Sequence, residues 1–172
     1  MIVCTLTALT VFCQKREKEP EYDYLSVGAN VLTNTIGSFK EKSFATVEFG
    51  RSFGIFDLGL MAGRLTFADS DSSWFSELLP TINVFSKGRF SESLTLGAGF
   101  IFHAKNNFLT EITNSINFSP SNQLVISICE GNYFFDGRRS DSKAQYIGLS
   151  ATYNFIAKGS KTNTLKKRSL LE

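Results

Sequence analysis

Eight segments of this chain alternate apolar and polar residues, and this alternation constrains the fold more than any other feature of the sequence. Successive side chains of a β-strand point to opposite faces, so each segment has one apolar and one polar face. Segments that are regularly spaced and even in number are typical of an up-and-down sheet joined by hairpins. The strands are expected at 23–33, 43–50, 54–66, 74–86, 90–102, 107–118, 122–135 and 144–156.

The connections between these strands alternate in kind. Short turns of Gly, Ser and Pro are RSFG, SKGR and SPSN, whereas TNTIGSFKE, ADSDSS, HAKNN and DGRRSDSK are more polar and mostly longer. Successive connections lie at opposite ends of an up-and-down sheet, so we expect short turns at one end and longer loops at the other. The composition agrees, because 13 Gly and 17 Phe with only 3 Pro is unusual for a helical protein.

The two faces differ enough to predict which one points inward. One face is large, apolar and almost uncharged, while the other is rich in Gly, Ser and Thr and poor in Lys and Arg. A soluble lipocalin-like barrel would enclose the apolar face around a ligand and show charged residues to water. A bilayer instead requires an apolar outer face and a closed sheet that pairs every backbone group. The sequence therefore predicts an all-β, eight-stranded antiparallel up-and-down transmembrane β-barrel, with the soluble ligand-binding barrel as the alternative.

The chain from Tyr22 to Phe155 resembles the small eight-stranded bacterial outer-membrane β-barrel proteins, of the size of the OmpA membrane domain and OmpX and of the Bacteroidetes type. The resemblance rests on the alternation, the unequal turns and the last strand. In the family that strand carries alternate apolar residues and a closing aromatic residue, which the barrel-assembly machinery reads as a signal. The resemblance implies export to the outer membrane of a Gram-negative bacterium, with both termini in the periplasm. The residues that match the closing-strand signal are Ile147, Leu149, Ala151, Tyr153 and Phe155.

The two ends of the chain lie outside the expected barrel at 22–156. Residues 1–13 form an uncharged apolar run before the mixed linker 14–21, which is typical of a secretory signal peptide. Acylation of Cys13 and a buried first segment are the alternatives to cleavage of this signal. Residues 157–172 carry five basic side chains, so they are expected to form a basic, disordered periplasmic tail, with an anionic partner as a further hypothesis. This tail departs from the family pattern, in which the closing aromatic is usually the last residue.

Phe residues recur at the short-turn end of every second expected strand. Aromatic side chains at one level around a barrel form a girdle where hydrocarbon meets headgroups. The general preference of Phe for strands and turn flanks is the alternative explanation. The residues predicted to form a periplasmic aromatic girdle are Phe49, Phe85, Phe118 and Phe155.

Acidic side chains fall on the polar face, where they would point into the barrel. An eight-stranded barrel is just wide enough to be filled by side chains, so no wide pore is expected. No Lys or Arg falls cleanly on that face, and the negative charge would be met by Arg64 or Lys42 near a strand end or by protonation. We interpret the acids as part of a solvated polar interior, with proton conduction or ligand binding as the alternative. The expected interior acids are Glu48, Asp57, Glu77 and Glu111.

His103, the single histidine, is the residue that would support a catalytic role. Lipid A deacylases are eight-stranded outer-membrane barrels that use a His, Ser and Glu set, with the His and Ser two residues apart. Here Lys105 stands where that Ser would be, and a general base without its nucleophile is not an esterase. His103 is therefore interpreted as a loop residue, and a lipid A-modifying enzyme stays as an alternative. Cys129 is expected to be a small interior filler, and no metal or cofactor site is predicted.

Charge in the last long loop suggests a surface contact. Arg138 and Arg139 are adjacent, and paired guanidinium groups suit the phosphates of lipopolysaccharide, although a solvated loop is the alternative. Nucleic-acid binding is not expected, because the body of the chain has no basic stripe with stacking aromatic residues. The sequence thus favours a non-enzymatic outer-membrane barrel with a structural or interaction role, in contact with outer-membrane lipid and lipopolysaccharide.

Overall fold

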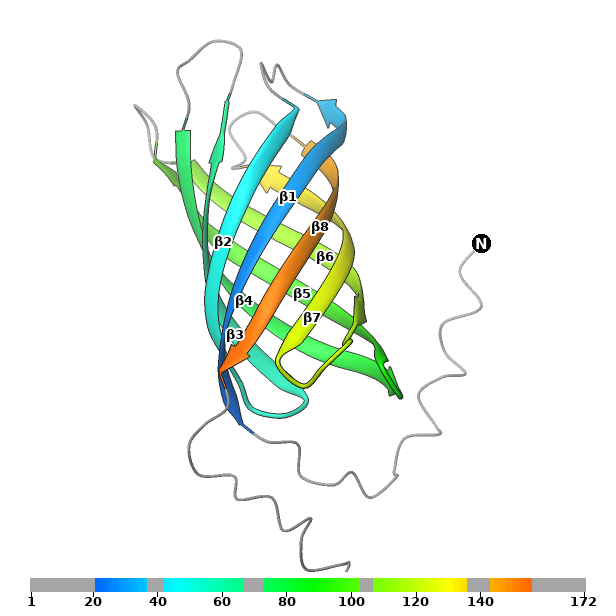
Figure 1. The fold of residues 1–172 in the computed structure, drawn as a ribbon. Coiled ribbons are helices and arrows are strands. Elements are labelled where there is room, and N and C mark those ends of the chain that lie inside the picture. The colour runs from blue at the N-terminus through cyan, green and yellow to red at the C-terminus, as the bar shows by residue number, and fades with distance from the viewer. Residues whose placement is uncertain (1–20, 37–41, 67–72, 103–106, 136–142, 156–172) are drawn as a thin grey trace, which may run out of the picture.

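A computed structural model describes residues 21–36, 42–66, 73–102, 107–135 and 143–155. In these residues eight antiparallel strands pair in chain order and close into a barrel (Figure 1). The predicted up-and-down β-barrel is thereby confirmed, and the strand ends differ from the expected ones by three residues or fewer. The strands are β1 (Tyr22–Ile36), β2 (Ser43–Ser52), β3 (Phe56–Leu65), β4 (Ser73–Lys87), β5 (Phe90–Phe102), β6 (Asn107–Phe118), β7 (Leu124–Phe135) and β8 (Lys143–Phe155).

The first and last strands close the barrel. Their ladder runs from Asp23 opposite Phe155 to Ile36 opposite Lys143. Because β1 and β8 pair along nearly their whole length, the sheet has no free edge on which other chains could add. The start of β1 and the end of β8 lie at the same end of the barrel as the short turns (Figure 1).

The outer wall of the barrel is apolar. Val27, Leu60 and Leu149 are typical of it, with 52%, 58% and 58% of their surface exposed. A largely apolar wall of this kind is unfavourable in water and matches the hydrocarbon of a bilayer. None of the described residues forms a helix that is long and apolar enough to cross a membrane. The residues of the closing-strand signal all lie on this wall: Ile147, Leu149, Ala151, Tyr153 and Phe155.

Glycine makes two of the short turns possible. Gly54, between β2 and β3, has φ of 90°, and Gly88, between β4 and β5, has φ of 65°. Residues with a side chain rarely adopt this left-handed region, whereas glycine enters it without a steric cost. Lys87 pairs with Phe90 across the second turn, so β4 and β5 form a tight hairpin.

Bulky inward side chains lie over glycines of the neighbouring strand. Tyr146 of β8 is paired with Gly131 of β7, and a Cβ atom at Gly131 would collide with the tyrosine ring. Glu77 of β4 is paired with Gly99 of β5, where a Cβ atom would collide with the β4 backbone. The narrow interior therefore accommodates large side chains only where the adjacent strand has none. The same arrangement holds for Tyr24 over Gly50 and for Phe75 over Gly63.

The interior has an apolar half at the loop end and a polar half at the short-turn end. At the loop end the ring of Phe44 packs against those of Phe75, Tyr133 and Tyr146, with centroids 6.4, 6.0 and 5.7 Å apart. The expectation of a small, polar inner face is confirmed for the short-turn half and is wrong for the loop half, because the inward positions there carry bulky apolar residues. This apolar plug consists of Leu32, Phe44, Met61, Leu65, Phe75, Leu79, Ile101, Leu109, Tyr133, Ala144 and Tyr146.

We predict that Gly99→Val prevents efficient folding, whereas Ala98→Val is tolerated. Position 99 faces the crowded interior, and position 98, its neighbour on β5, is exposed on the outer wall. Overpacking of an interior costs about 1–3 kcal/mol or more. The folded fraction is measured from heat-dependent migration on a denaturing gel after refolding into detergent. Equal folded fractions for the two variants would contradict the packing described above.

Candidate functional site

A cavity of about 260 Å³ occupies the polar half of the barrel interior. It reaches from Ser86 and Ser119, beside the short turns, to Tyr133 and Tyr146 of the apolar plug. Its wall is otherwise made mainly of small polar side chains, with Met61, Leu79 and Val125 as apolar members. The cavity therefore extends toward the short-turn end of the barrel, where β1 begins and β8 ends. The plug lies between the cavity and the loop end.

The carboxyl groups expected in the interior do lie there. Glu48, Asp57 and Glu111 line the cavity, and Glu77 is buried beside Glu111. Glu77 and Glu111 come from β4 and β6, on either side of β5, and are only 1% and 3% exposed. Gly99 and Gly97 of β5 lie opposite them and leave the room that both carboxyl groups occupy.

Hydroxyl groups satisfy part of this acidic cluster. The hydroxyl groups of Thr113 and Tyr146 contact Oε1 of Glu111 and lie 2.7 Å from each other. Tyr24 donates a hydrogen bond to Glu48, with an oxygen–oxygen distance of 2.7 Å. Hydrogen bonds from hydroxyl groups to a buried carboxyl group offset much of the cost of its burial. The inward-facing Tyr24 and Tyr146 are therefore structural partners of the acids.

Glu77 has no such support. Among the described residues no hydroxyl, amide or basic group lies within hydrogen-bonding distance of either Glu77 oxygen, and its polar neighbour is the carboxyl group of Glu111, with which it can share a proton. A buried carboxyl group without a donor is unfavourable. Glu77 is thus the most destabilising member of the cluster.

The predicted compensation by basic residues is wrong. Arg64 lies on the outer wall of β3, and Lys42 is exposed at the start of β2. In the part of the chain that the structure describes, no Lys or Arg lines the cavity. The ion pairs among the described residues are those of Arg51 with Glu21 and Asp23, at 3.4 and 3.8 Å, and they lie outside the barrel. The inward positions of β3 are the odd-numbered ones from Asp57 to Leu65, so Arg64 faces outward.

The cavity suits hydrogen-bond donors, because among the described residues its wall carries carboxyl groups and no Lys or Arg. Cys129 faces it as expected, with its sulfur 3.9 Å from Oδ1 of Asn30. Within the described ranges no three His, Cys, Asp or Glu side chains are grouped so as to hold a metal ion. His103, Arg138 and Arg139 lie outside the described residues, as do 1–20 and 156–172.

The residues of the predicted girdle lie toward the short-turn half of the barrel. Phe49, Phe85 and Phe155 are exposed on the outer wall, by 58%, 39% and 44%. Phe118 is partly covered, because its ring packs against that of Phe90, with centroids 5.1 Å apart. The girdle itself stays a prediction.

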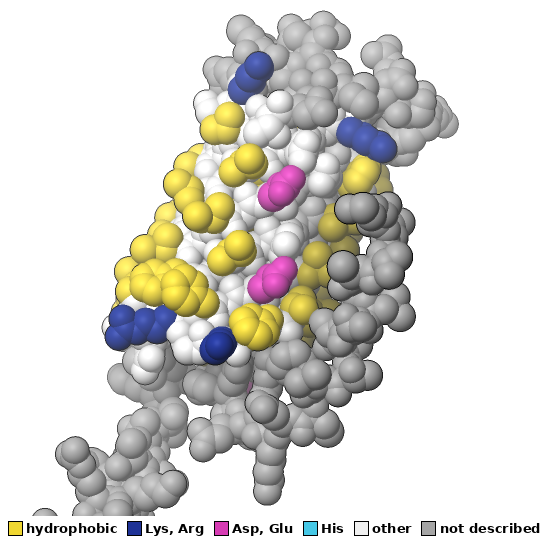
Figure 2. All heavy atoms as spheres, turned by 90° about the vertical axis from the view of Figure 1, so that its right-hand side faces the viewer, with side chains coloured by type: hydrophobic (Ala, Val, Ile, Leu, Met, Phe, Trp, Pro, Cys, Tyr) yellow, Lys and Arg dark blue, Asp and Glu magenta, His cyan; other side chains and the backbone are white. Residues whose placement is uncertain are grey.

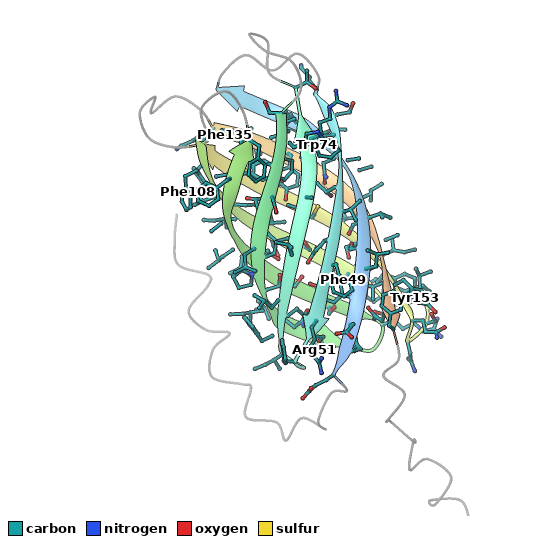
Figure 3. All side chains as sticks on the ribbon, turned by 90° about the vertical axis from the view of Figure 1, so that its left-hand side faces the viewer. Phe49, Arg51, Trp74, Phe108, Phe135 and Tyr153 are labelled. Atoms are coloured by element: carbon teal, nitrogen blue, oxygen red, sulfur yellow. The ribbon has the colours of Figure 1, made fainter. Side chains whose placement is uncertain are left out.

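A second group of exposed aromatic residues lies at the loop end, and the sequence analysis missed it. Trp74 pairs with Phe102, and the ring of Phe100 packs against that of Phe108 with centroids 5.6 Å apart. Figure 3 shows Phe49 and Tyr153 nearer the end where β1 begins and β8 ends. It shows Trp74 and Phe108 nearer the opposite end. These residues could have been found from the sequence, because each one continues the outward-facing alternate positions of its strand to the loop end.

Several solved structures share this architecture. Neisserial surface protein A matches with a TM-score of 0.61 and 7% sequence identity, over 80% of this chain and 100% of that one. The N-terminal barrel domain of Pseudomonas aeruginosa OprF matches with a TM-score of 0.59 and 9% identity, over 81% of this chain and 100% of that one. The chain has the fold of the small eight-stranded outer-membrane β-barrels. The outer membrane protein Ail of Yersinia pestis matches this barrel with a TM-score of 0.52 and 14% identity, over 79% of the chain and 100% of Ail.

The similarity of these outer-membrane barrels is one of fold. No protein-family model matches the sequence, and the search of curated proteins finds no match. An identity of 7–14% carries no information on particular inner residues, so the acidic cavity and the plug have to be understood from this chain alone.

We predict that Glu77→Gln raises the free energy of unfolding by about 1–3 kcal/mol, because the amide keeps the shape of the side chain, carries no charge and can donate to the adjacent Glu111 carboxyl group. Asp23→Asn is the matched control, since the Asp23 side chain is 51% exposed, and it should change stability little. Denaturant unfolding in lipid vesicles at neutral pH measures both. A folded Glu77→Gln barrel that is less stable than the wild type would show that the Glu77 carboxyl group is favourably partnered in the wild-type lumen.

Proposed function

We propose that this protein is an exported, integral outer-membrane β-barrel of a Gram-negative bacterium with a structural or interaction role, and that it is neither an enzyme nor a wide pore. The observation that carries the proposal is the outer wall, an apolar surface between two groups of aromatic residues around a closed sheet. Such a wall is stable in a bilayer, because the sheet pairs its backbone internally and the side chains contact hydrocarbon.

The interior supports the membrane assignment over a soluble ligand-binding barrel. A lipocalin-like protein would hold an apolar ligand in an apolar cavity. The cavity here is small and its wall is mainly polar, while large hydrophobic residues such as Leu96 and Ile128 point outward, with 52% and 58% of their surface exposed. The distribution of apolar surface is therefore opposite to that of a soluble barrel.

The interior also supports a non-conducting, non-enzymatic role. Leu65, Ile101, Leu109 and Tyr133 of the apolar plug are each no more than 1% exposed, and they fill the loop half of the lumen. The lipid A-modifying alternative needs a nucleophile two residues from His103, where the chain has Lys105. We therefore propose that the contacts of this protein are made at its surface and not in a reaction inside it.

The proposed contacts fall on three parts of the chain. The closing strand that ends at Phe155 would be recognised by the barrel-assembly machinery during biogenesis, once a signal peptide at 1–13 had directed export. Arg138 and Arg139 suit the phosphates of lipopolysaccharide at the loop end. The basic residues of 157–172 would meet an anionic partner in the periplasm.

The first test is extraction. We predict that the protein leaves the cell envelope only with detergent and migrates faster on a denaturing gel before heating than after it, because a closed barrel resists unfolding in cold detergent. Membrane fractionation and paired heated and unheated samples measure this. A stable monomer in water without detergent would contradict the membrane assignment and favour the soluble barrel.

The second test is conduction. We predict that the purified barrel shows no porin-like current steps in planar bilayers, because the apolar plug blocks the loop half of the lumen. Phe44→Ala combined with Tyr133→Ala removes two rings from the plug and should increase the ion leak, whereas Phe49→Ala on the outer wall should not. Steady large currents through the wild-type barrel would contradict the proposed closed lumen.

A further inference from the structure

A row of polar side chains crosses the otherwise apolar outer wall over β5–β8, and we call it the polar seam. Figure 2, which faces the right-hand side of Figure 1, shows acidic side chains on this wall with hydrophobic side chains near them. Glu92 of β5 and Glu130 of β7 are the outward-facing acids of the β5–β8 wall. The seam consists of Glu92, Asn114, Glu130, Asn132 and Gln145.

Strand register joins these residues into one continuous surface. Asn114 lies opposite Glu130 across β6 and β7, and Asn132 lies opposite Gln145 across β7 and β8. Residues paired in this way have Cβ atoms roughly 5 Å apart. Asn114 donates a hydrogen bond to Glu92 at 3.2 Å, and Gln145 donates one to Glu130 at 2.7 Å.

Among the described residues, the wall over β1–β4 has no counterpart to the seam. The mid-strand outward residues of β1–β4 include Val27, Val47, Leu60 and Leu78, which are 49–58% exposed. In those four strands charged outward residues lie near the strand ends, as Arg51 and Arg64 do. One side of the barrel is thus suited to lipid along its length, and the other side is not.

A carboxylate on a lipid-facing surface is unfavourable unless it has a partner. Lipid chains offer neither donors nor acceptors, and lipid phosphates would be repelled by the two acids. In the described residues the ion pairs are those of Arg51 with Glu21 and Asp23, so neither Glu92 nor Glu130 is paired with a base. The hydrogen bonds from Asn114 and Gln145 leave the charge in place.

The seam is complementary to itself. Each of its carboxamides has two N–H donors and a carbonyl acceptor, and Asn114 and Gln145 each use one donor within the seam. Donors and acceptors therefore alternate along a single line of about four strands. A twofold axis places one copy of such a line against another with donors facing acceptors, as in other isologous interfaces.

We propose that the polar seam is the contact surface of a homodimer within the membrane, in which two copies of this barrel meet through β5–β8. In this dimer the amides of Asn114, Asn132 and Gln145 donate to Glu130 of the second copy, and hydrocarbon is excluded from the charged groups. Polar side chains hold transmembrane segments together in this way because their alternative partner is lipid. The inference rests on the proposed membrane location, since the seam has no need of a partner in water.

The test is site-directed cross-linking of the full-length protein in membranes, with the native cysteines replaced by Ala. Asn132→Cys places a thiol in the seam, and Val27→Cys places one on the opposite wall as the matched control. We expect Asn132→Cys to give a cross-linked product of twice the monomer mass and Val27→Cys to stay monomeric. A monomer in both, equal cross-linking in both, or a product with the mass of a different protein would overturn the proposal.

A second variant tests the polar contact itself. In the Asn132→Cys background, Glu130→Leu should lower the yield of cross-linked dimer about tenfold, because a twofold dimer loses the contact twice. Ile128→Leu, two residues away on the same wall, should leave the yield unchanged. An unchanged yield with Glu130→Leu would show that any dimer forms through other contacts.

Heat-dependent gel migration of each variant separates the two proposals. Loss of the heat-modifiable, detergent-extracted form would contradict the membrane barrel. A barrel that folds and stays monomeric would contradict the dimer alone.

Discussion

The ladder between β1 and β8 is the interaction on which the rest of this structure depends. It joins the two ends of the sheet from Asp23 opposite Phe155 to Ile36 opposite Lys143. Without it both strands would present unpaired backbone groups, which hydrocarbon cannot satisfy. Closure also divides the side chains into an inner and an outer set, so the lipid-facing wall, the plug and the acidic cavity all follow from it. The apolar residues of β8 take part in this closure through their backbone, and their side chains lie on the apolar outer wall.

The narrow lumen explains the unusual inner surface. Eight strands leave little more than the volume of their own side chains, so a large residue on one strand requires a small one beside it. Glycines supply that space under Tyr146, Phe75 and Glu77. The loop half is filled by the plug and the short-turn half keeps a polar cavity, which makes the two ends of the lumen chemically different. An acid such as Glu77 is retained in this space without a donor, so the lumen is not optimised for stability alone.

Much of the architecture could be predicted from the alternation, because its period equals that of a strand. The eight strands and the inward positions of Glu48, Asp57, Glu77 and Glu111 were all expected from parity. The apolar plug was not, because Phe44, Phe75 and Tyr133 look like ordinary strand residues until their strands converge at one end. The polar seam was missed for a similar reason. Asn114, Glu130 and Gln145 are polar residues at outward positions of three different strands whose other outward positions are mostly apolar. Only their shared location on the barrel makes them one surface.

What the sequence by itself determined is the side of the wall on which each residue lies, since parity along a strand is a local property. Only the tertiary structure decided which residues of different strands meet, because that depends on the stagger between strands around the closed barrel. The stagger brings Glu77 and Glu111 together across the glycines of β5, and it aligns Asn114 with Glu130 on the outside. A change of one residue in register would move each of these side chains to the opposite face. The sequence therefore determines which residues make up the inner and outer surfaces. The register between strands determines which of those side chains contact one another.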